Sequence, residues 1–413
     1  MAYIPPHKRN VKDADRPSPT PDVLVPQFER NLTLKSSKYN SEKRKDKHSS
    51  QGGKIIYAKH SINRWWVIGL IDDDQFPASV RLEPVSCESI ERKNGEKPLV
   101  LVCAHPPKEF NETTGNSRRS PWVSIAQMIQ PHLLTSYRSV WNEMEFHESE
   151  EIKPSFVARF GKILLHGSPS VTLDNVKRSL ADESTSSRVK RSFYTNLPSS
   201  YMEGILGNVA PNIGVDFDEE KEYYHVKVFD KSRPDTTISC KCTALKGGEL
   251  ELHKIELSAV RHLVADISCL EKNLDLRLML YTKVTLTALT DDEKLSLSHL
   301  IKSAIIDPNV KGGLRWPLGK ECFGDKYSVV GAWHTKAKAF KNLYMKLKVR
   351  DADRFDFRTS MGEFSREVGL KMTGIVGQLQ DHMAEVGPVT DMLQDTLKLI
   401  WDNFLSCNDL PFS

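Results

Sequence analysis

The chain has 413 residues, of which 39% are apolar and 27% are charged, and it carries a formal net charge of +4. This length corresponds to two or three average domains, and the sequence has no apolar run near the roughly 18 residues that a membrane span requires. We therefore expect neither a staple-dependent mini-protein nor an integral membrane protein. The seven cysteines are scattered and the first residues lack a secretory pattern, so we expect an intracellular protein of the nucleus or cytoplasm, not a secreted one.

Positive charge is concentrated at the amino-terminal end. Residues 1–60 hold 13 Lys and Arg against 6 Asp and Glu, whereas the remaining residues are slightly acidic. Prolines recur through the first thirty residues, and Ser, Lys and Asp fill much of the rest. Because such a segment buries too little apolar surface to offset its conformational entropy, we predict that residues 1–53 form a disordered basic tail.

Short β-branched and aromatic runs, separated by turn residues, predict strands at residues 54–57, 64–71, 78–82 and 99–102. They are followed by a helical segment that begins at Pro121. Residues 54–150 are therefore predicted to form a small β-rich module with a helical connector.

From residue 222 to 289 the sequence alternates between apolar and polar positions over long runs. The clearest run, Leu274 to Leu286, has leucines on one face and Arg277, Tyr281 and Lys283 on the other. A period of two predicts antiparallel strands. A helix is predicted at residues 291–306, further strands at 327–332 and 342–350, and a hairpin at 355–373. An amphipathic helix at 389–405 carries Leu393, Leu397 and Trp401 on one stripe. The fold class is therefore α+β, with a large antiparallel sheet or barrel at residues 155–374 and C-terminal helices at 375–413 packing on it.

Two resemblances concern the amino-terminal end. The opening Met1-Ala-Tyr-Ile-Pro-Pro-His-Lys-Arg9, together with the Trp65-Trp66 pair and residues 96–100, resembles a plant protein family of unknown function. The same opening resembles the Tyr-Ile-Pro-Pro-His-Leu-Arg tail element of DEAD-box RNA helicases, although Lys8 replaces the leucine and the helicase core is missing. That resemblance implies a partner-binding element. Its residues are Tyr3, Ile4, Pro5, Pro6, His7, Lys8 and Arg9.

Basic clusters favour contact with RNA or with an RNA-associated protein, because lysine and arginine bind phosphate without sequence specificity. A strand that mixes basic residues with tyrosine adds the combination that single strands favour. The candidate nucleic-acid-binding residues are Lys43, Arg44, Lys45, Lys47, Arg188, Lys190, Arg191, Tyr344, Lys346, Lys348 and Arg350.

A candidate enzymatic site lies at Glu249 and Glu251, which precede His253 with alternating leucines. This pattern resembles the Glu-x-Glu-x-Lys strand of tunnel-type triphosphate phosphohydrolases, although His253 replaces the lysine. The resemblance implies Mg²⁺ or Mn²⁺ inside an eight-stranded barrel, where basic residues would neutralise a polyphosphate. These basic residues would be Arg277, Lys283, Lys346, Lys348 and Arg350. The competing interpretation is an ordinary solvated strand face.

We predict a non-enzymatic interaction protein associated with RNA or ribonucleoprotein, with no cofactor and no resident metal. The metal-dependent phosphohydrolase is the enzymatic alternative, and a ligand-free scaffold is the third possibility.

Overall fold

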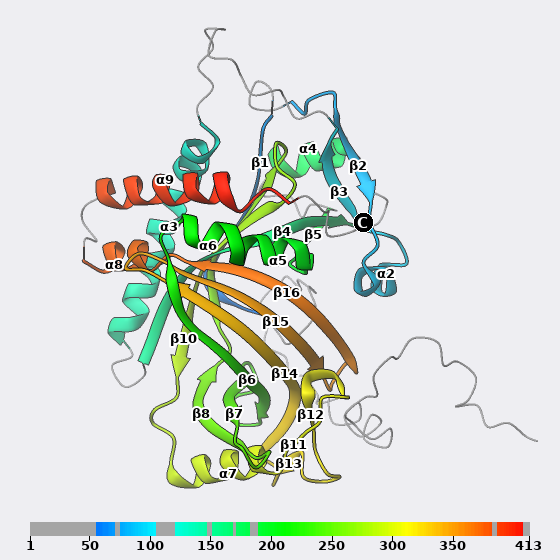
Figure 1. Cartoon of the computed structure of the whole chain (residues 1–413), viewed down its shortest axis with the longest axis vertical. Helices are drawn as coiled ribbons and strands as arrows, with labels where there is room; N and C mark the ends of the chain where they lie inside the picture. Colours follow the sequence, from blue (N-terminus) through cyan, green and yellow to red (C-terminus); the bar gives the residue numbers. More distant parts are fainter. Residues whose placement is uncertain are drawn as a thin grey trace, which may run out of the picture.

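The computed structural model describes residues 55–70, 75–104, 120–146, 151–167, 171–181, 189–381 and 386–407 (Figure 1). The predicted disordered tail, with the helicase-like element at residues 3–9 and the cluster at 43–47, lies outside these residues. The strands are β1 (Ile56–Ile68), β2 (Val80–Pro84), β3 (Leu99–Cys103), β4 (Glu151–His166), β5 (Lys190–Tyr194), β6 (Asp216–Asp230), β7 (Ile238–Ala244), β8 (Leu250–Leu257), β9 (Val260–Cys269), β10 (Asp275–Thr285), β11 (Ile305–Ile306), β12 (Leu314–Arg315), β13 (Cys322–Phe323), β14 (Tyr327–Lys341), β15 (Lys346–Asp356) and β16 (Met361–Lys371). The helices are α2 (Glu88–Asn94), α3 (Pro121–Phe146), α4 (Leu173–Ala181), α5 (Ser199–Gly204), α6 (Ala210–Asn212), α7 (Asp291–Lys302), α8 (Thr373–Asp381) and α9 (Val386–Asn403), with short π and 3-10 turns η2 (Ile205–Val209) and η3 (Lys311–Gly313).

The central part of the sheet closes on itself. Its strand order runs β10, β8, β7, β6, β14, β15, β16 and β4, and β4 also pairs with β10 along the whole length of the latter strand. Every neighbouring pair in this ring is antiparallel. The strands therefore form a closed barrel, which removes the free edges that an open sheet would expose.

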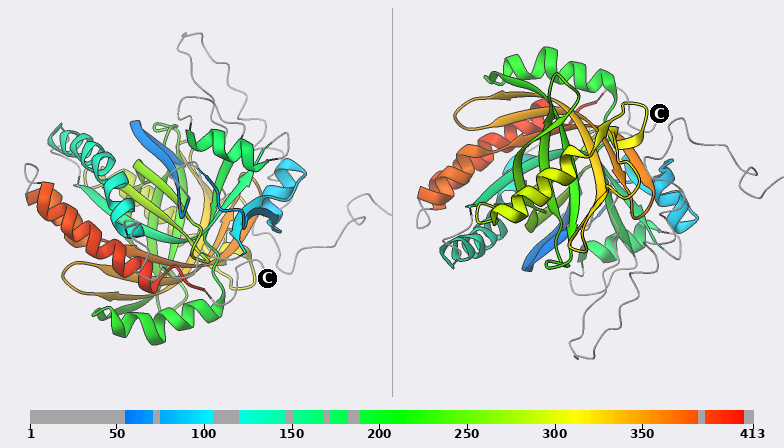
Figure 2. Two further views of the ribbon diagram at one scale, coloured as in Figure 1. Left: turned by 90° about the horizontal axis from the view of Figure 1, so that it is seen from above. Right: turned by 90° about the horizontal axis from the view of Figure 1, so that it is seen from below.

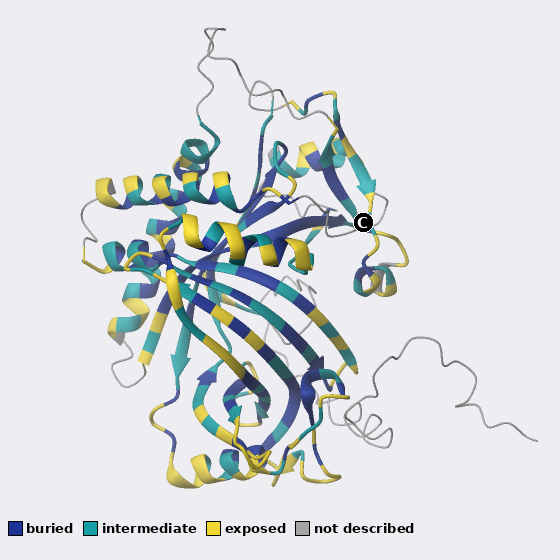
Figure 3. Cartoon of the chain, viewed as in Figure 1, coloured by how far each residue is buried: buried dark blue, intermediate teal, exposed yellow. Residues whose placement is uncertain are grey.

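The barrel carries its apolar side chains on the outside. On β10, Leu276, Leu278 and Leu280 are fully buried in a core shared with the helices, whereas Met279 and Lys283 line the barrel interior. This arrangement produces the striped burial pattern seen along the curved strands in Figure 3. Because successive side chains of a strand point to opposite faces, an apolar outer face leaves the polar residues facing inward.

Helices cover the apolar outer face at two places. Leucines and aromatic residues of α3, α8 and α9 join the core built on β4, β9 and β10, and α5 with η2 adds Tyr201 and Ile205. At the far end, α7 packs Leu297 and Leu300 against strands β6 to β8. The two further views in Figure 2 show these helices arranged around the outside of the strands.

The α+β class and the closing C-terminal helix are confirmed: Leu397 and Ile400 of α9 are buried, and Trp401 is 6% exposed. The strand predicted at residues 342–350 begins later, at Lys346, because Asn342 caps the turn by accepting hydrogen bonds from the backbone amides of Tyr344 and Met345. No helix among the described residues is both long enough and apolar enough to cross a bilayer.

The residues of the predicted β-rich module are hydrogen-bonded to the large sheet. β1 pairs in parallel with β9, and β3 pairs with both β2 and β4. The four-part division of the chain stays a prediction.

Candidate functional site

The barrel contains a partly open cavity of about 290 Å³. Its walls come mainly from β4, β6, β7, β8, β10, β14 and β15, and its lining is dominated by polar and charged side chains. Among the lining residues that the structure describes, seven are Lys or Arg and two are Asp or Glu; the basic ones are Arg159, Lys227, Arg261, Lys283, Arg350, Arg354 and Arg358. The interior is therefore strongly basic, although residues 61–413 as a whole are slightly acidic.

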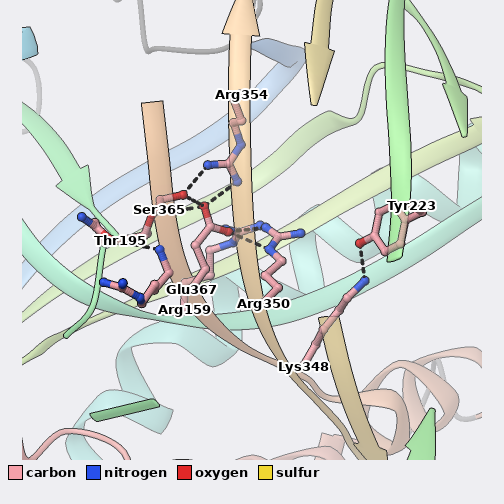
Figure 4. Close-up of polar contacts among 10 residues, drawn as sticks. Arg159, Thr195, Tyr223, Lys348, Arg350, Arg354, Ser365 and Glu367 are labelled. Carbon is pink, nitrogen blue, oxygen red and sulfur yellow. Dashed lines mark hydrogen bonds and ion pairs between the residues drawn. The ribbon is translucent and has the colours of Figure 1, made fainter. Parts of the chain in front are cut away.

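Three arginines of the cavity converge on one carboxylate (Figure 4). Arg159 donates from Nη1 to Oε2 of Glu367 over 2.9 Å, and Arg350 donates from Nε to the same oxygen over 2.8 Å. Arg354 donates to the other oxygen, Oε1. Ser365 Oγ also donates to Oε1, over 3.1 Å.

This cluster keeps its charge because the arginines outweigh the cost of burial. Glu367 is 3% exposed, and desolvation alone would raise its pKa. The charges of Arg350, Arg159 and Arg354 reverse that effect and hold the pKa of Glu367 well below its ordinary value. One carboxylate thus faces three guanidinium groups, and two positive charges are left over.

Aromatic rings, rather than carboxylates, hold most of the neighbouring lysines. Lys227 Nζ lies 4.3 Å from the ring centre of Trp333. Lys241 and Lys348 both lie over Tyr223, at 4.3 and 4.8 Å, and Lys348 Nζ donates to the Tyr223 hydroxyl over 2.6 Å. A neutral ring positions an ammonium group without cancelling its charge. These contacts therefore preserve the positive potential of the interior.

Burial, together with repulsion between the charges, alters proton binding in the interior. Burial, followed by the neighbouring Lys283, lowers the pKa of Lys227 to about 7. Burial and the neighbouring Arg350 lower the pKa of Lys348 to about 8. Burial also takes the pKa of His225 well below its ordinary value, with nearby lysines acting in the same direction. An anion placed in the cavity would stabilise the charged forms of all three groups.

The two carboxylates of the lining, Glu256 and Asp356, are paired with cations. Glu256 accepts from Lys254 and, over 3.2 Å, from Lys283. Asp356 is paired with Arg358 over 3.0 Å and also accepts from the backbone amides of residues 358 and 359.

Some residues singled out from the sequence meet in this interior. Lys283 and Arg350 line the cavity, and Lys348 lies beside it against Tyr223. Lys346 is paired with Asp218 over 2.8 Å, and Arg277 is bound by Asp266 over 2.6 and 2.8 Å, so both have local acidic partners.

Other predicted residues lie elsewhere. Glu249 precedes β8 and is exposed; Glu251 is also exposed and lies 3.6 Å from His253, and neither glutamate lines the cavity. Tyr344 is exposed in the turn between β14 and β15.

The second predicted basic run lies on and before β5. Lys190 is exposed, and Arg191 stacks over Trp65 with 5.0 Å to the ring centre. Arg188 lies outside the described residues.

Sequence reasoning missed Arg159, Lys227, Arg354 and Glu367. For Lys227 a signal was present, because Tyr223, His225 and Lys227 alternate with buried Tyr224 and Val226 in the strand-like run that begins at residue 222. Arg159 gives a weaker signal, since it is a lone charge inside the apolar stretch from residue 156 to 160. A charge in such a stretch indicates that the second face of the strand is polar.

Together, the fold and the cavity define a closed antiparallel β-barrel protein with a basic interior. The chain belongs to the family described as domain of unknown function DUF7903, whose model matches residues 49–404. The predicted membership in a family of unknown function is thereby confirmed, while its plant origin and the helicase-like tail element stay predictions. No curated protein matches the sequence.

Several solved structures are similar in part. The Pct1 RNA triphosphatase of S. pombe, solved in complex with the Spt5 CTD, is 10% identical, with a TM-score of 0.42 over 73% of this chain and 99% of that chain. A putative adenylate cyclase from Bacillus halodurans is 11% identical, with a TM-score of 0.23 over 52% of this chain and 90% of that chain. The PH1012 protein from Pyrococcus horikoshii is 8% identical, with a TM-score of 0.24 over 50% and 87%. Similarity at this level transfers no activity to this chain.

Proposed function

We propose that the barrel binds a small oligophosphate anion, such as a triphosphate group, in its interior. The observation that carries this proposal is the excess of positive charge in the cavity: seven Lys and Arg against two carboxylates in the lining, with Glu367 as a third just beyond it.

Uncompensated buried cations destabilise a fold, because each loses hydration and repels its neighbours. The low pKa of Lys227 reflects that cost. A polyanion removes the repulsion, and phosphate oxygens accept the paired hydrogen bonds that guanidinium groups donate. A ligand that supplies several oxygens along a short chain suits a cavity whose cations come from many different strands.

The size of the cavity narrows the choice of ligand. At about 290 Å³ it lies at the lower end of the range of small-molecule sites. A nucleic-acid duplex or a folded RNA exceeds that volume, whereas a di- or triphosphate group fits the scale. This proposal concerns binding, in keeping with the non-enzymatic function expected from the sequence.

The test is isothermal titration calorimetry of the full chain with inorganic triphosphate, pyrophosphate and sulfate at low salt. We expect the affinity to increase with the number of charges on the anion and to fall as salt rises. Lys227→Met should weaken triphosphate binding by about tenfold, since a hydrogen bond to a charged group contributes about 1.5 kcal/mol or more.

Lys336→Met provides the matched control, because this exposed lysine lies on the same strand pair outside the cavity. Its triphosphate affinity should equal that of the unmodified protein. A folded protein that binds no triphosphate at low salt would overturn the proposal.

A second function, association with RNA through the basic tail, rests on a separate observation, the net charge of +7 on residues 1–60. Most of these residues lie outside the described structure, and the proposal requires no contribution from the barrel. RNA retained at low salt by the full chain supports it, and loss of retention on removal of residues 1–53 would assign the contact to the tail.

A further inference from the structure

We propose that the barrel takes its oligophosphate as the free polyanion, without a divalent cation, so that Mg²⁺ weakens binding instead of supporting it. This inference rests on the proposed function and specifies the chemical form of the ligand. It follows from how Glu367 and the two carboxylates of the cavity lining, Glu256 and Asp356, are already used.

A metal that bridges phosphate oxygens needs carboxylate oxygens that are free to bind it. Glu367 receives hydrogen bonds from Arg159, Arg350 and Arg354, divided between its two oxygens. Glu256 receives one lysine on each oxygen: Lys254 on Oε1 and Lys283 on Oε2.

Each of these carboxylates would have to release its cations before it could bind a metal ion. For Glu367, whose side chain is almost fully buried, that exchange would leave three guanidinium groups without their shared counter-ion, which is strongly unfavourable. Asp356 is committed in the same way to Arg358 and to backbone amides.

The glutamates that the sequence pattern suggested as metal ligands do not supply the missing oxygens. Glu249 and Glu251 are exposed and stand outside the cavity lining. Within the described ranges, no group of three or more His, Cys, Asp or Glu side chains is arranged to hold a metal ion. The donor set of the interior therefore does not fit a divalent cation.

The charge balance points in the same direction. Binding Mg²⁺ removes two negative charges from triphosphate and occupies oxygens that the arginines and lysines would otherwise bind. A site with surplus cations loses attraction to such a complex, whereas a site with surplus carboxylates gains it. The sign of the Mg²⁺ effect thus distinguishes the two kinds of site.

The experiment measures triphosphate binding by calorimetry in EDTA and in excess MgCl₂, at matched ionic strength. We expect the apparent affinity in MgCl₂ to be lower by about tenfold, the equivalent of one lost charge-assisted contact. Binding that requires Mg²⁺ or Mn²⁺, or that tightens when either is added, would overturn the inference while leaving the proposed function intact. Absence of binding in both buffers would instead overturn the proposed function, and this inference with it.

The double variant Glu249→Gln, Glu251→Gln supplies an independent check. Because both residues are exposed, the variant should fold, and its triphosphate affinity should match that of the unmodified protein in either buffer. Phosphate release from triphosphate that depends on Mn²⁺ or Mg²⁺ and disappears in this variant would also overturn the inference.

Discussion

Replacing Glu367 by Gln tests whether this carboxylate is the internal counter-ion of the barrel. The substitution keeps the shape of the side chain but removes the charge shared by Arg159, Arg350 and Arg354. Since removing one partner of a buried ion pair leaves an uncompensated charge, we expect a loss of about 3 to 5 kcal/mol in the free energy of unfolding. For a chain of this size, that corresponds to a drop of roughly 4 to 7 °C in the thermal midpoint.

The loss should depend on pH in a defined direction. The arginines hold the pKa of Glu367 well below its ordinary value, so its contribution is fully present above the pKa of the unfolded state, about 4.3. It disappears as the pH falls through the folded-state pKa. The difference between Glu367→Gln and the unmodified protein should therefore be full at pH 7 and shrink on acidification below about pH 4.

Thermal denaturation with and without triphosphate measures the loss of stability in Glu367→Gln and the stabilisation that triphosphate provides. If the barrel binds triphosphate as proposed, triphosphate at one hundred times its dissociation constant should stabilise the unmodified protein by about 2.7 kcal/mol. At the same triphosphate concentration, this stabilisation should be larger in Glu367→Gln, because the three arginines no longer share a carboxylate and can bind the ligand.

Glu363→Gln is the control. Glu363 lies on the same strand and the same face, and it forms no ion pair among the described residues, so its replacement should change stability by less than about 1 kcal/mol. An unchanged midpoint for Glu367→Gln would refute the argument that the arginines depend on this carboxylate.

Three further outcomes are expected. Raising the pH from 7 to 9 should weaken triphosphate binding by about tenfold or more, because Lys227 and Lys348, with pKa values of about 7 and 8, lose their charges. A calorimetric affinity that stays constant over this range would contradict a role for these two lysines in binding. Trp401→Ala should lower the free energy of unfolding, measured in denaturant, by about 3 to 5 kcal/mol, whereas Lys398→Ala on the exposed face of α9 should change it little. Equal effects of the two substitutions would show that Trp401 is not part of the core. Removing residues 1–53 should leave the thermal midpoint unchanged and flatten the salt dependence of RNA binding, which a filter-binding salt series would reveal.

Periodicity was sufficient to predict the two faces of β10. The alternation along β10 correctly separated Leu276, Leu278 and Leu280 from Tyr281 and Lys283, because the period-2 pattern depends only on local backbone geometry. The same reasoning explains why the C-terminal helix could be recognised from its apolar stripe.

Closure of the barrel lay beyond the reach of local patterns. The pairing of β10 with β4 joins Leu278 to Ala158, residues separated by more than one hundred positions, and nothing in either segment specifies the other. Sequence alternation also could not reveal which polar face is enclosed. The sequence pattern therefore suggested that Glu251 and Lys283 share the barrel interior, because both lie in alternating runs. Of the two, only Lys283 lines the cavity.

The ring of strands also constrains how the chain can fold during synthesis. β4 and β16 are joined by contacts such as Ala158 with Leu370, so the ring stays open until about residue 371 has left the ribosome. Until then, the leucine-rich outer face of β10 lacks its cover from α9, which follows later still. We therefore expect barrel formation to be a late and slow event dominated by long-range contacts. The nascent chain should pass through a stage at which exposed apolar strands make it prone to aggregation.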